Sequence, residues 1–336
     1  MQLSKLYWRR ASIGLIVTLV CSIAGQFLAK LPGFSLIGHL VLALLLGMCL
    51  QFARSLTAAA QQSTPFIANK FLRAGIILLG FKLNLVILMS AGLKSLEAAI
   101  VIVAVMIPLN YFVARFFKVE HTLALLAACG CSICGAAAVM GVSSAVRAKT
   151  DQSVLAVAIV AILGTLFTLI EVGLQPFLGF TDAQFGTMAG LSLHEIAHAV
   201  AAGGAAGPVG TDSAIIAKLS RVLLLAPVAI IVGVLEARRF RKQDGAGEGR
   251  MSVPIPWFMG GFILASAIGS YLPFVNDFVP SLVQLAYLLL GMAMAALGLN
   301  VNFGVILQKG LRPMVGALLC SFVIMGLSLS IVHTFF

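Results

Sequence analysis

Runs of apolar residues about as long as a membrane span recur along the chain from Ala11 to the C-terminal Phe336. A bilayer core about 30 Å thick is crossed by roughly 20 apolar residues in a helix. Charged residues make up only 10% of the 336 residues, against about a quarter in ordinary soluble domains. The sequence therefore predicts an all-α polytopic membrane protein, in which residues 1–336 form a single transmembrane domain within a lipid bilayer.

Two of the eleven apolar segments are unusually rich in glycine. The segments are 11–29, 36–53, 74–93, 98–114, 122–146, 153–180, 185–209, 214–235, 253–273, 282–308 and 313–336. Segments 122–146 and 185–209 contain the glycine clusters, and irregular backbone at membrane depth is tolerated only where it is buried in protein or lines a wet cavity. Two architectures stay open: nine transmembrane helices with two re-entrant hairpins, or eleven helices of which two are broken.

The basic residues predict how the chain is oriented. They lie at the ends of the apolar segments, so we interpret the net charge of +11 as a topological signal and not as a nucleic-acid surface. The strongest basic cluster lies in one hydrophilic loop, at about residues 238–252, which we place in the cytoplasm. Following the spans from this loop predicts a cytoplasmic N-terminus and a periplasmic C-terminus in a bacterial inner membrane.

Internal similarity favours the nine-helix alternative. Residues 79–94 align without gaps with residues 297–312, and a weaker match pairs Lys149 and Gly164 with Lys218 and Gly233. With nine helices and two hairpins on opposite faces, the members of each pair run in opposite directions. Inverted repeats with discontinuous elements at the midplane are typical of secondary transporters.

The string Gly130-Cys131-Ser132-Ile133-Cys134-Gly135 is the first candidate for a functional break. A break frees backbone N–H groups, which can face an anion at the positive end of a half-helix dipole. A tight helix crossing built from small residues is the alternative. A metal or redox site at Cys129, Cys131 and Cys134 is a further alternative, although such sites usually have additional ligands. We predict that Gly130, Cys131, Ser132, Cys134 and Gly135 contact an anion.

The second candidate is His194-Glu195-Ile196-Ala197-His198, which matches a zinc-protease signature with both imidazoles on one helix face. A catalytic zinc needs a third protein ligand, and no other span offers an acid in a ligand motif. We therefore assign His194 and His198 to anion contact or proton coupling. The glycines that follow, including Gly203 and Gly204, predict a second break that meets the first near the bilayer midplane.

Lys82 and three asparagines complete the predicted site. Lys82 lies near the middle of an apolar segment, where a charge is costly unless it faces a partner or a wet cavity. Asn84, Asn300 and Asn302 occupy matching positions in the aligned segments and could supply amide donors to an oxyanion. Snorkelling of Lys82 and hydrogen bonding of the asparagines between helices are the alternatives.

Three strings carry a family resemblance: residues 130–135, residues 194–204, and Gly210-Thr211-Asp212-Ser213 followed by Lys218 and Arg221. They resemble the YeiH-type family of bacterial membrane proteins, named as sulfate exporters. The resemblance extends over nearly the whole chain. It implies membership of the cation–proton antiporter and anion transporter superfamily, with a core of inverted repeats that moves against a scaffold.

Our hypothesis from the sequence is a secondary transporter that exports a small inorganic or organosulfur anion, such as sulfate or sulfite, by alternating access. H⁺ and Na⁺ are the candidate coupling ions and a homodimer is the candidate assembly. We expect no enzymatic activity, cofactor or bound metal. The alternatives are an intramembrane zinc protease and an anion channel.

Overall fold

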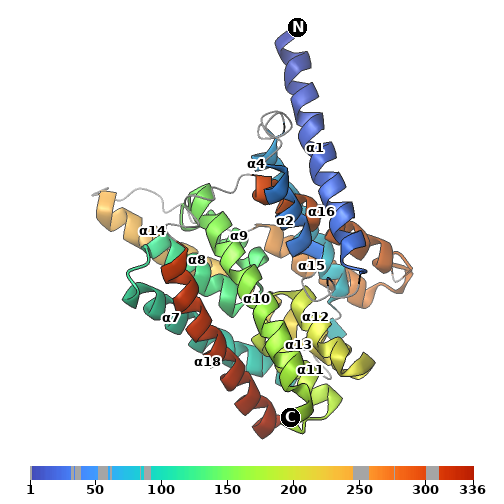
Figure 1. The fold of residues 1–336 in the computed structure, drawn as a ribbon, viewed down its shortest axis with the longest axis vertical. Coiled ribbons are helices and arrows are strands. Elements are labelled where there is room, and N and C mark those ends of the chain that lie inside the picture. The colour runs from blue at the N-terminus through green and yellow to red at the C-terminus, as the bar shows by residue number, and fades with distance from the viewer. Residues whose placement is uncertain are drawn as a thin grey trace. The chain divides into compact units, whose positions relative to one another are not determined.

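The structure is a computed structural model. It describes residues 2–31, 34, 39–51, 60, 63–83, 85–86, 92–244, 257–275, 277–299 and 310–336. All regular secondary structure in these ranges is helical (Figure 1), which confirms the prediction of an all-α protein.

The chain forms two compact units, and each unit combines two separate stretches of the sequence. The first unit comprises Met1–Val86 and Gly261–Phe303, and the second comprises Ile87–Gly260 and Gly304–Phe336. The region predicted as a single transmembrane domain therefore divides into two compact units.

The first unit is built around α16 (Val279–Leu299), which packs against α1 (Gln2–Leu28), α2 (His39–Leu50) and α5 (Leu72–Leu79). Glycines allow α2 and α16 to approach closely, because a Cβ at Gly47 or Gly298 would collide with the backbone of the facing helix. The remaining described elements of this unit are α4 (Thr64–Phe66), η2 (Ile67–Phe71), η3 (Gly80–Lys82), η4 (Pro273–Val275) and most of α15 (Trp257–Tyr271).

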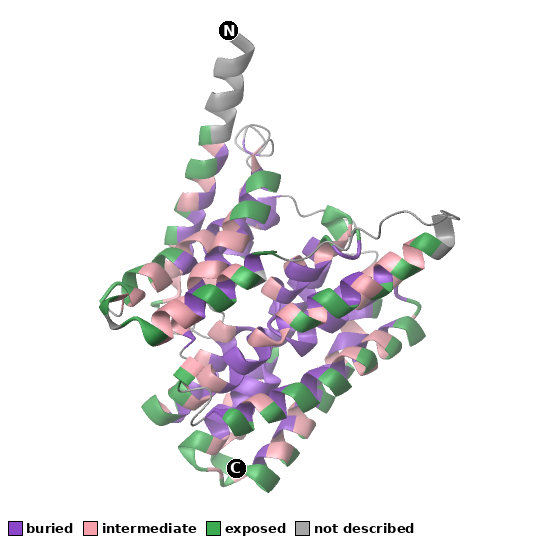
Figure 2. Ribbon diagram, turned by 180° about the vertical axis from the view of Figure 1, so that it is seen from behind, coloured by how far each residue is buried: buried purple, intermediate pink, exposed green. Residues whose placement is uncertain are grey.

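The second unit is built around α10 (Thr150–Leu178), in which every residue from Ser153 to Ala161 is buried. Buried residues gather where its helices meet (Figure 2). The other helices are α7 (Leu93–Phe116), α8 (His121–Ser132), α9 (Ala136–Ser143), α11 (Asp182–Ser192), α12 (Ile196–Ala205), α13 (Gly207–Leu223), α14 (Leu225–Asp244) and α18 (Leu311–Phe335). A helical stretch that is buried on all sides lies in the core of a large bundle, so the first half of α10 supports the elements around it.

Six helices in the described part of the chain are long and apolar enough to cross a membrane. They are Thr64–Lys82, Leu93–Phe116, Thr150–Leu178, Gly207–Arg241, Val279–Leu299 and Leu311–Phe335. The chain is therefore a multi-pass membrane protein, as predicted. Helix α14 extends to Asp244, into the stretch predicted as a cytoplasmic loop, and residues 245–252 lie outside the described residues.

Helices α8 and α9 form a hairpin, because both of its ends lie beside the C-terminal part of α14. His121, the first residue of α8, bonds to Glu236 (Nε2···Oε1 2.8 Å). Arg147, which follows α9, stacks on Phe240 with its guanidinium 4.3 Å from the ring centroid. The arms contain 12 and 8 residues, too few to cross a bilayer, which takes about 20.

Helices α11 and α12 form a second hairpin. The start of α11 at Asp182 and the end of α12 at Gly203 both approach Gly210 on α13, where a Cβ would lie 3.2 Å from Asp182 O and 2.6 Å from Gly203 O. The arms contain 11 and 10 residues. Both glycine-rich segments thus fold as helical hairpins, the arrangement that the nine-helix alternative expects and the eleven-helix alternative does not.

The two hairpins enter the second unit from opposite ends. Helix α10 has 29 residues, which at about 1.5 Å per residue separate its ends by about 40 Å. It connects the base of the first hairpin, before Thr150, to the base of the second hairpin, at Asp182. Hairpins that start about 40 Å apart and point toward each other meet near the middle of α10.

The structure also corrects one sequence match. Lys149 is the N-cap of α10, whereas Lys218 lies in the interior of α13, so the predicted pairing of these lysines is wrong. Each repeat instead consists of a hairpin followed by a long helix, and the two copies are α8–α9–α10 and α11–α12–α13. The repeat is visible in the sequence as Gly130-Cys131-Ser132-Ile133 and, sixty positions later, Gly190-Leu191-Ser192-Leu193.

Candidate site where the two hairpin tips meet

The tip of each hairpin is a short non-helical turn in the core of the second unit. The first tip is Ile133–Gly135, and it turns at Gly135, whose φ of +73° is readily adopted only by glycine. Gly135 N donates to Gly130 O at 2.9 Å, which closes the end of α8. The second tip is Leu193–Glu195, where both flanking residues have extended backbone.

Lys218 on α13 joins the two tips. Its ammonium donates to Ile133 O at 2.9 Å and to Leu193 O at 2.6 Å, and the residue is fully buried. The last carbonyls of a helix have no partner within it and carry partial negative charge. Lys218 therefore compensates the carboxyl ends of α8 and α11 simultaneously.

Arg221 lies one turn further along α13 and repeats this role. Its guanidinium is fully buried. It donates to Cys131 O and Ser132 O at the end of α8, at 3.1 and 3.2 Å. It also donates to Leu191 O at 2.6 Å, Leu193 O at 2.9 Å and Gly190 O at 3.4 Å at the end of α11.

Glu195 in the second tip contacts the amino end of the first hairpin's returning arm. Ala136 N, the first amide of α9, donates to Glu195 Oε1 at 3.4 Å. Glycine at position 135 makes room for this contact, because a Cβ there would lie 2.5 Å from Glu195 Cγ. The side chain is buried, so a carboxylate fills the positive end of α9.

Four buried ionisable side chains are thus brought together: Lys218, Arg221, Glu195 and Glu171 of α10. Glu171 is fully buried, and its charge acts on Arg221. Within the described part of the chain, no ion pair joins any of these cations to any of these acids. The charges are compensated by helix ends and by one another over longer distances, an arrangement that is costly in a membrane and typical of functional sites.

His194 and His198 do not share a helix face, which corrects the prediction. Helix α12 begins at Ile196, so His194 lies in the tip before it. His194 Nε2 is 3.1 Å from the Ser321 hydroxyl on α18, whereas His198 Nε2 is 3.4 Å from the Thr165 hydroxyl on α10. The two imidazoles therefore have partners on different helices. Within the described ranges, no three metal-ligating side chains form a cluster that could hold a metal ion.

Five of the predicted site residues lie at the end of α8 and in the first tip. Cys131 and Ser132 contribute backbone carbonyls to Arg221, and the Ser132 hydroxyl accepts from Asn110 Nδ2 at 3.1 Å. Gly130 packs against Val139 and Val160. Cys134 is buried in the tip beside Gly135, within electrostatic range of Lys218 and Glu195.

The other predicted residues lie elsewhere. Gly203 and Gly204 are within α12, where Gly203 packs against Gly210. A break does follow them, at Ala206 between α12 and α13, but it lies at the base of the second hairpin. The tip that meets the first hairpin is Leu193–Glu195, which corrects the prediction. Lys82 belongs to the first unit, where its ammonium donates to the Tyr287 hydroxyl at 3.0 Å. Asn84, Asn300 and Asn302 lie outside the described residues.

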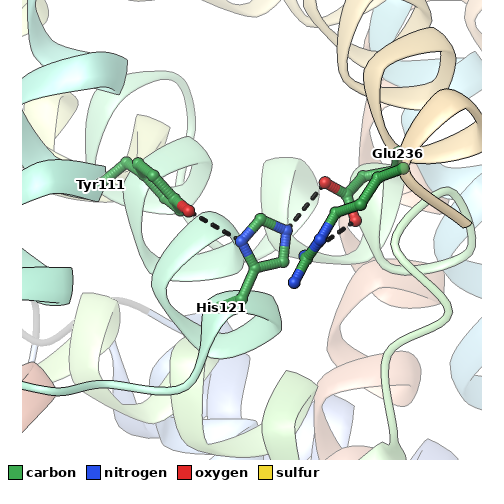
Figure 3. Close-up of polar contacts among 4 residues, drawn as sticks. Tyr111, His121 and Glu236 are labelled. Carbon is green, nitrogen blue, oxygen red and sulfur yellow. Dashed lines mark hydrogen bonds and ion pairs between the residues drawn. The ribbon is translucent and has the colours of Figure 1, made fainter. Parts of the chain in front are cut away.

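A second polar cluster holds the base of the first hairpin (Figure 3). The His121 imidazole bonds to Glu236 and, through Nδ1, to the Tyr111 hydroxyl at 2.7 Å. Arg239 reaches the other Glu236 oxygen at 3.5 Å. Beside this cluster, α7, α8 and α14 line a largely apolar cavity of about 570 Å³, which lies away from the tips.

Four residues of the site were missed as site residues in the sequence: Glu171, Glu195, Lys218 and Arg221. Two signals could have found them. Lys218 and Arg221 are three positions apart inside an apolar segment, a spacing that puts two charges on one helix face. The repeat of Gly130–Ile133 at Gly190–Leu193 would have placed the second tip at Glu195.

Comparison with known proteins confirms the resemblance. A family model described as "Conserved hypothetical protein 698" matches residues 13–317. A UPF0324 membrane protein from Lactobacillus johnsonii is 53% identical over 88% of each chain. Relatives with the same designation occur in Bifidobacterium longum, 45% identical over 98% of each chain, and in Listeria innocua, 37% identical over 99% of this chain and 97% of the relative. No solved structure gives a significant match. The chain therefore belongs to this YeiH-like family of membrane proteins.

Proposed function

We propose that this membrane protein is a secondary transporter of a small anion that works by alternating access. The observation that carries the proposal is the meeting of two oppositely directed hairpin tips around buried Lys218 and Arg221. Interrupted helices at membrane depth are typical of transporter substrate sites, and buried ionisable groups in membranes usually serve transport.

The charge of the site favours an anion. Lys218 and Arg221 compensate the carboxyl ends of α8 and α11. The amino ends of the returning arms, α9 and α12, begin at the same two tips. These amino ends carry partial positive charge, which suits contact with a small oxyanion.

Sulfate, sulfite and small organosulfonates are the proposed substrates, in accordance with the family resemblance, and export is the proposed direction. The proposed location is the bacterial inner membrane. The predictions for Lys82 and for the three asparagines remain part of the proposal. A homodimer remains the proposed assembly.

The test is flux in proteoliposomes that contain the purified protein, with labelled sulfate, sulfite and methanesulfonate outside. We expect saturable uptake of at least one anion and faster uptake when the same unlabelled anion is preloaded inside. Cys134→Leu, which fills the first tip, should reduce this flux, whereas Cys49→Leu at an exposed position on α2 should not.

Three outcomes contradict the proposal. Flux that rises linearly with concentration and ignores preloading would instead support an anion channel. Stoichiometric zinc in the purified protein, together with chelator-sensitive cleavage of membrane peptides, would support the protease alternative. Proteoliposomes that exchange none of the three anions would exclude the proposed substrates.

A further inference from the structure

The carboxylate of Glu195 occupies a position that suits an external anion. Its Oε1 accepts from Ala136 N at 3.4 Å at the amino end of α9, a helix of eight residues. The other oxygen, Oε2, is buried and has no hydrogen-bond partner among the described residues. The second tip thus places a carboxylate against the first hairpin, and one oxygen of this carboxylate accepts no hydrogen bond from the described residues.

We infer that Glu195 binds the proton that moves with the anion, and that its carboxylate and the transported anion occupy the amino end of α9 alternately. This inference rests on the proposed function and specifies its coupling ion as H⁺. Without an anion, Glu195 is ionised and caps α9. With a proton on Oε2, the neutral side chain is released from α9 and the anion takes its place.

The surrounding charges favour this exchange. Neighbouring elements each contribute ionisable groups that face Glu195 or the cations beside it. They are Lys218 and Arg221 from α13, Cys131 from α8, Cys134 from the first tip, Glu171 from α10 and His194 from the second tip. Protonation of Glu195 adds one positive charge to a buried site, where uncompensated charge is costly. An incoming anion restores the balance, so the proton and the anion bind together.

The repeat shows why one proton suffices. In the alignment of the two hairpins, Glu195 corresponds to Gly135. The first tip therefore has no acid that could cap α12, and Gly135 instead leaves the space that Glu195 fills. The two hairpins are therefore complementary: the second tip supplies one acid, and the amino end of α9 in the first hairpin accepts it.

Thermodynamic linkage fixes the sign of the pH effect. If protonated Glu195 favours anion binding, then bound anion equally favours the proton. Anion affinity should therefore rise as the pH falls, by up to about tenfold per pH unit for one linked proton. Sulfate and methanesulfonate are suitable probes, because their own charge does not change near neutral pH.

The experiment measures stabilisation of the detergent-purified full chain by sulfate and by methanesulfonate, from about pH 5 to about pH 8. The variants are Glu195→Gln, which mimics the protonated acid, Glu171→Gln at the second buried carboxyl of the site, and Glu236→Gln, at a buried carboxyl away from the tips, as the control. Wild type and Glu236→Gln should bind more weakly as the pH rises, and Glu171→Gln should keep this pH dependence even if its affinity differs. Glu195→Gln should bind at all pH values with the affinity that wild type reaches in acid. Anion-driven alkalinisation of the medium in proteoliposomes should disappear in Glu195→Gln.

The outcomes separate this inference from the proposed function. Anion binding by wild type with no dependence on pH, or unchanged pH dependence in Glu195→Gln, overturns the role of Glu195 and leaves anion transport standing. Loss of pH dependence in Glu171→Gln instead would assign the proton to Glu171. Absence of anion binding and exchange in wild type at every pH would refute the proposed function itself. If Glu195→Gln does not fold, Glu195→Asp, whose shorter carboxylate caps α9 less well, should still show tighter binding than wild type near neutral pH.

Discussion

Lys218 and Arg221 show how single cations can be accommodated within a membrane protein without a salt bridge. Their partners are backbone carbonyls at the carboxyl ends of two short helices, groups that would otherwise lack hydrogen bonds in a medium without water. Each cation therefore satisfies polar groups from both hairpins. A substitution at either position should affect the fold as well as the proposed transport.

Lys218→Met should lower the free energy of unfolding by about 2–6 kcal/mol, because two buried carbonyls lose their donor at about 1–3 kcal/mol each. Thermal unfolding of the detergent-purified protein measures this effect. Lys149→Met, at the exposed N-cap of α10, is the matched control and should unfold close to wild type. Equal stability of both variants would show that Lys218 does not support the tips.

Single residues also show what the sequence could reveal about the site. The string from Gly130 to Gly135 identified the first tip, because clustered small residues, among them a glycine that can adopt positive φ, are visible in the sequence itself. Which chemical groups face the site was not predictable in this way. Cys131 and Ser132 act through backbone carbonyls toward Arg221, and that partner comes from a helix about ninety residues away in the chain.

The next scale is the hairpin, and the two hairpins turn by different means. The first turns at Gly135, with φ of +73° and ψ of −132°. In the second, Leu193 and Glu195 have φ of −64° and −119° with ψ near 155°, a conformation that any residue adopts. Glycine content therefore could locate the first tip but not the second.

The same comparison explains why the tip of the second hairpin was predicted too far along the chain. Gly203 serves close packing, since a Cβ there would lie 2.7 Å from Gly210 O on α13. A glycine that brings two helices together and a glycine that ends a helix look alike in a single sequence. The apolar segments, by contrast, predict that both elements lie within the membrane, because length and hydropathy are properties of the sequence itself.

Gly135→Ala should disrupt the first hairpin more than Gly179→Ala disrupts the end of α10. Both glycines have positive φ, and placing another residue in such a conformation costs about 1–3 kcal/mol. Only at Gly135 does the added Cβ also collide with Glu195, because nothing lies within 4 Å at Gly179. We expect a lower unfolding temperature and altered anion binding for Gly135→Ala alone. Indistinguishable variants would mean that the tips adjust freely.

At the scale of the whole molecule, the contacts of the second unit define its two ends. The basic end of α14 lies with Arg147, before α10. The C-terminal end of α18 lies at the opposite end of α10, where Phe180 and His333 stack and Lys94 donates to Phe335 O at 3.3 Å. From the positive-inside rule we propose that α14's basic end faces the cytoplasm and Phe336 the periplasm.

Reporter fusions test this orientation. Alkaline phosphatase fused after Phe336 should be active and a green fluorescent protein at the same site should be dark, because each reporter works on only one side of the inner membrane. Fusions after Asp244 are the control and should give the reverse pattern. A fluorescent C-terminal fusion would contradict the predicted topology.

The bonds of Lys218 and Arg221 also restrict the way in which this protein can move. Both side chains come from one turn of α13 and donate hydrogen bonds to both hairpins. If one hairpin moved away alone, buried carbonyls and a buried cation would lose their hydrogen-bond partners. The hairpins are therefore unsuited to act as a pair of independent gates. Any exposure of the site to one side of the membrane and then to the other must carry the two tips and α13 together, as one rigid body.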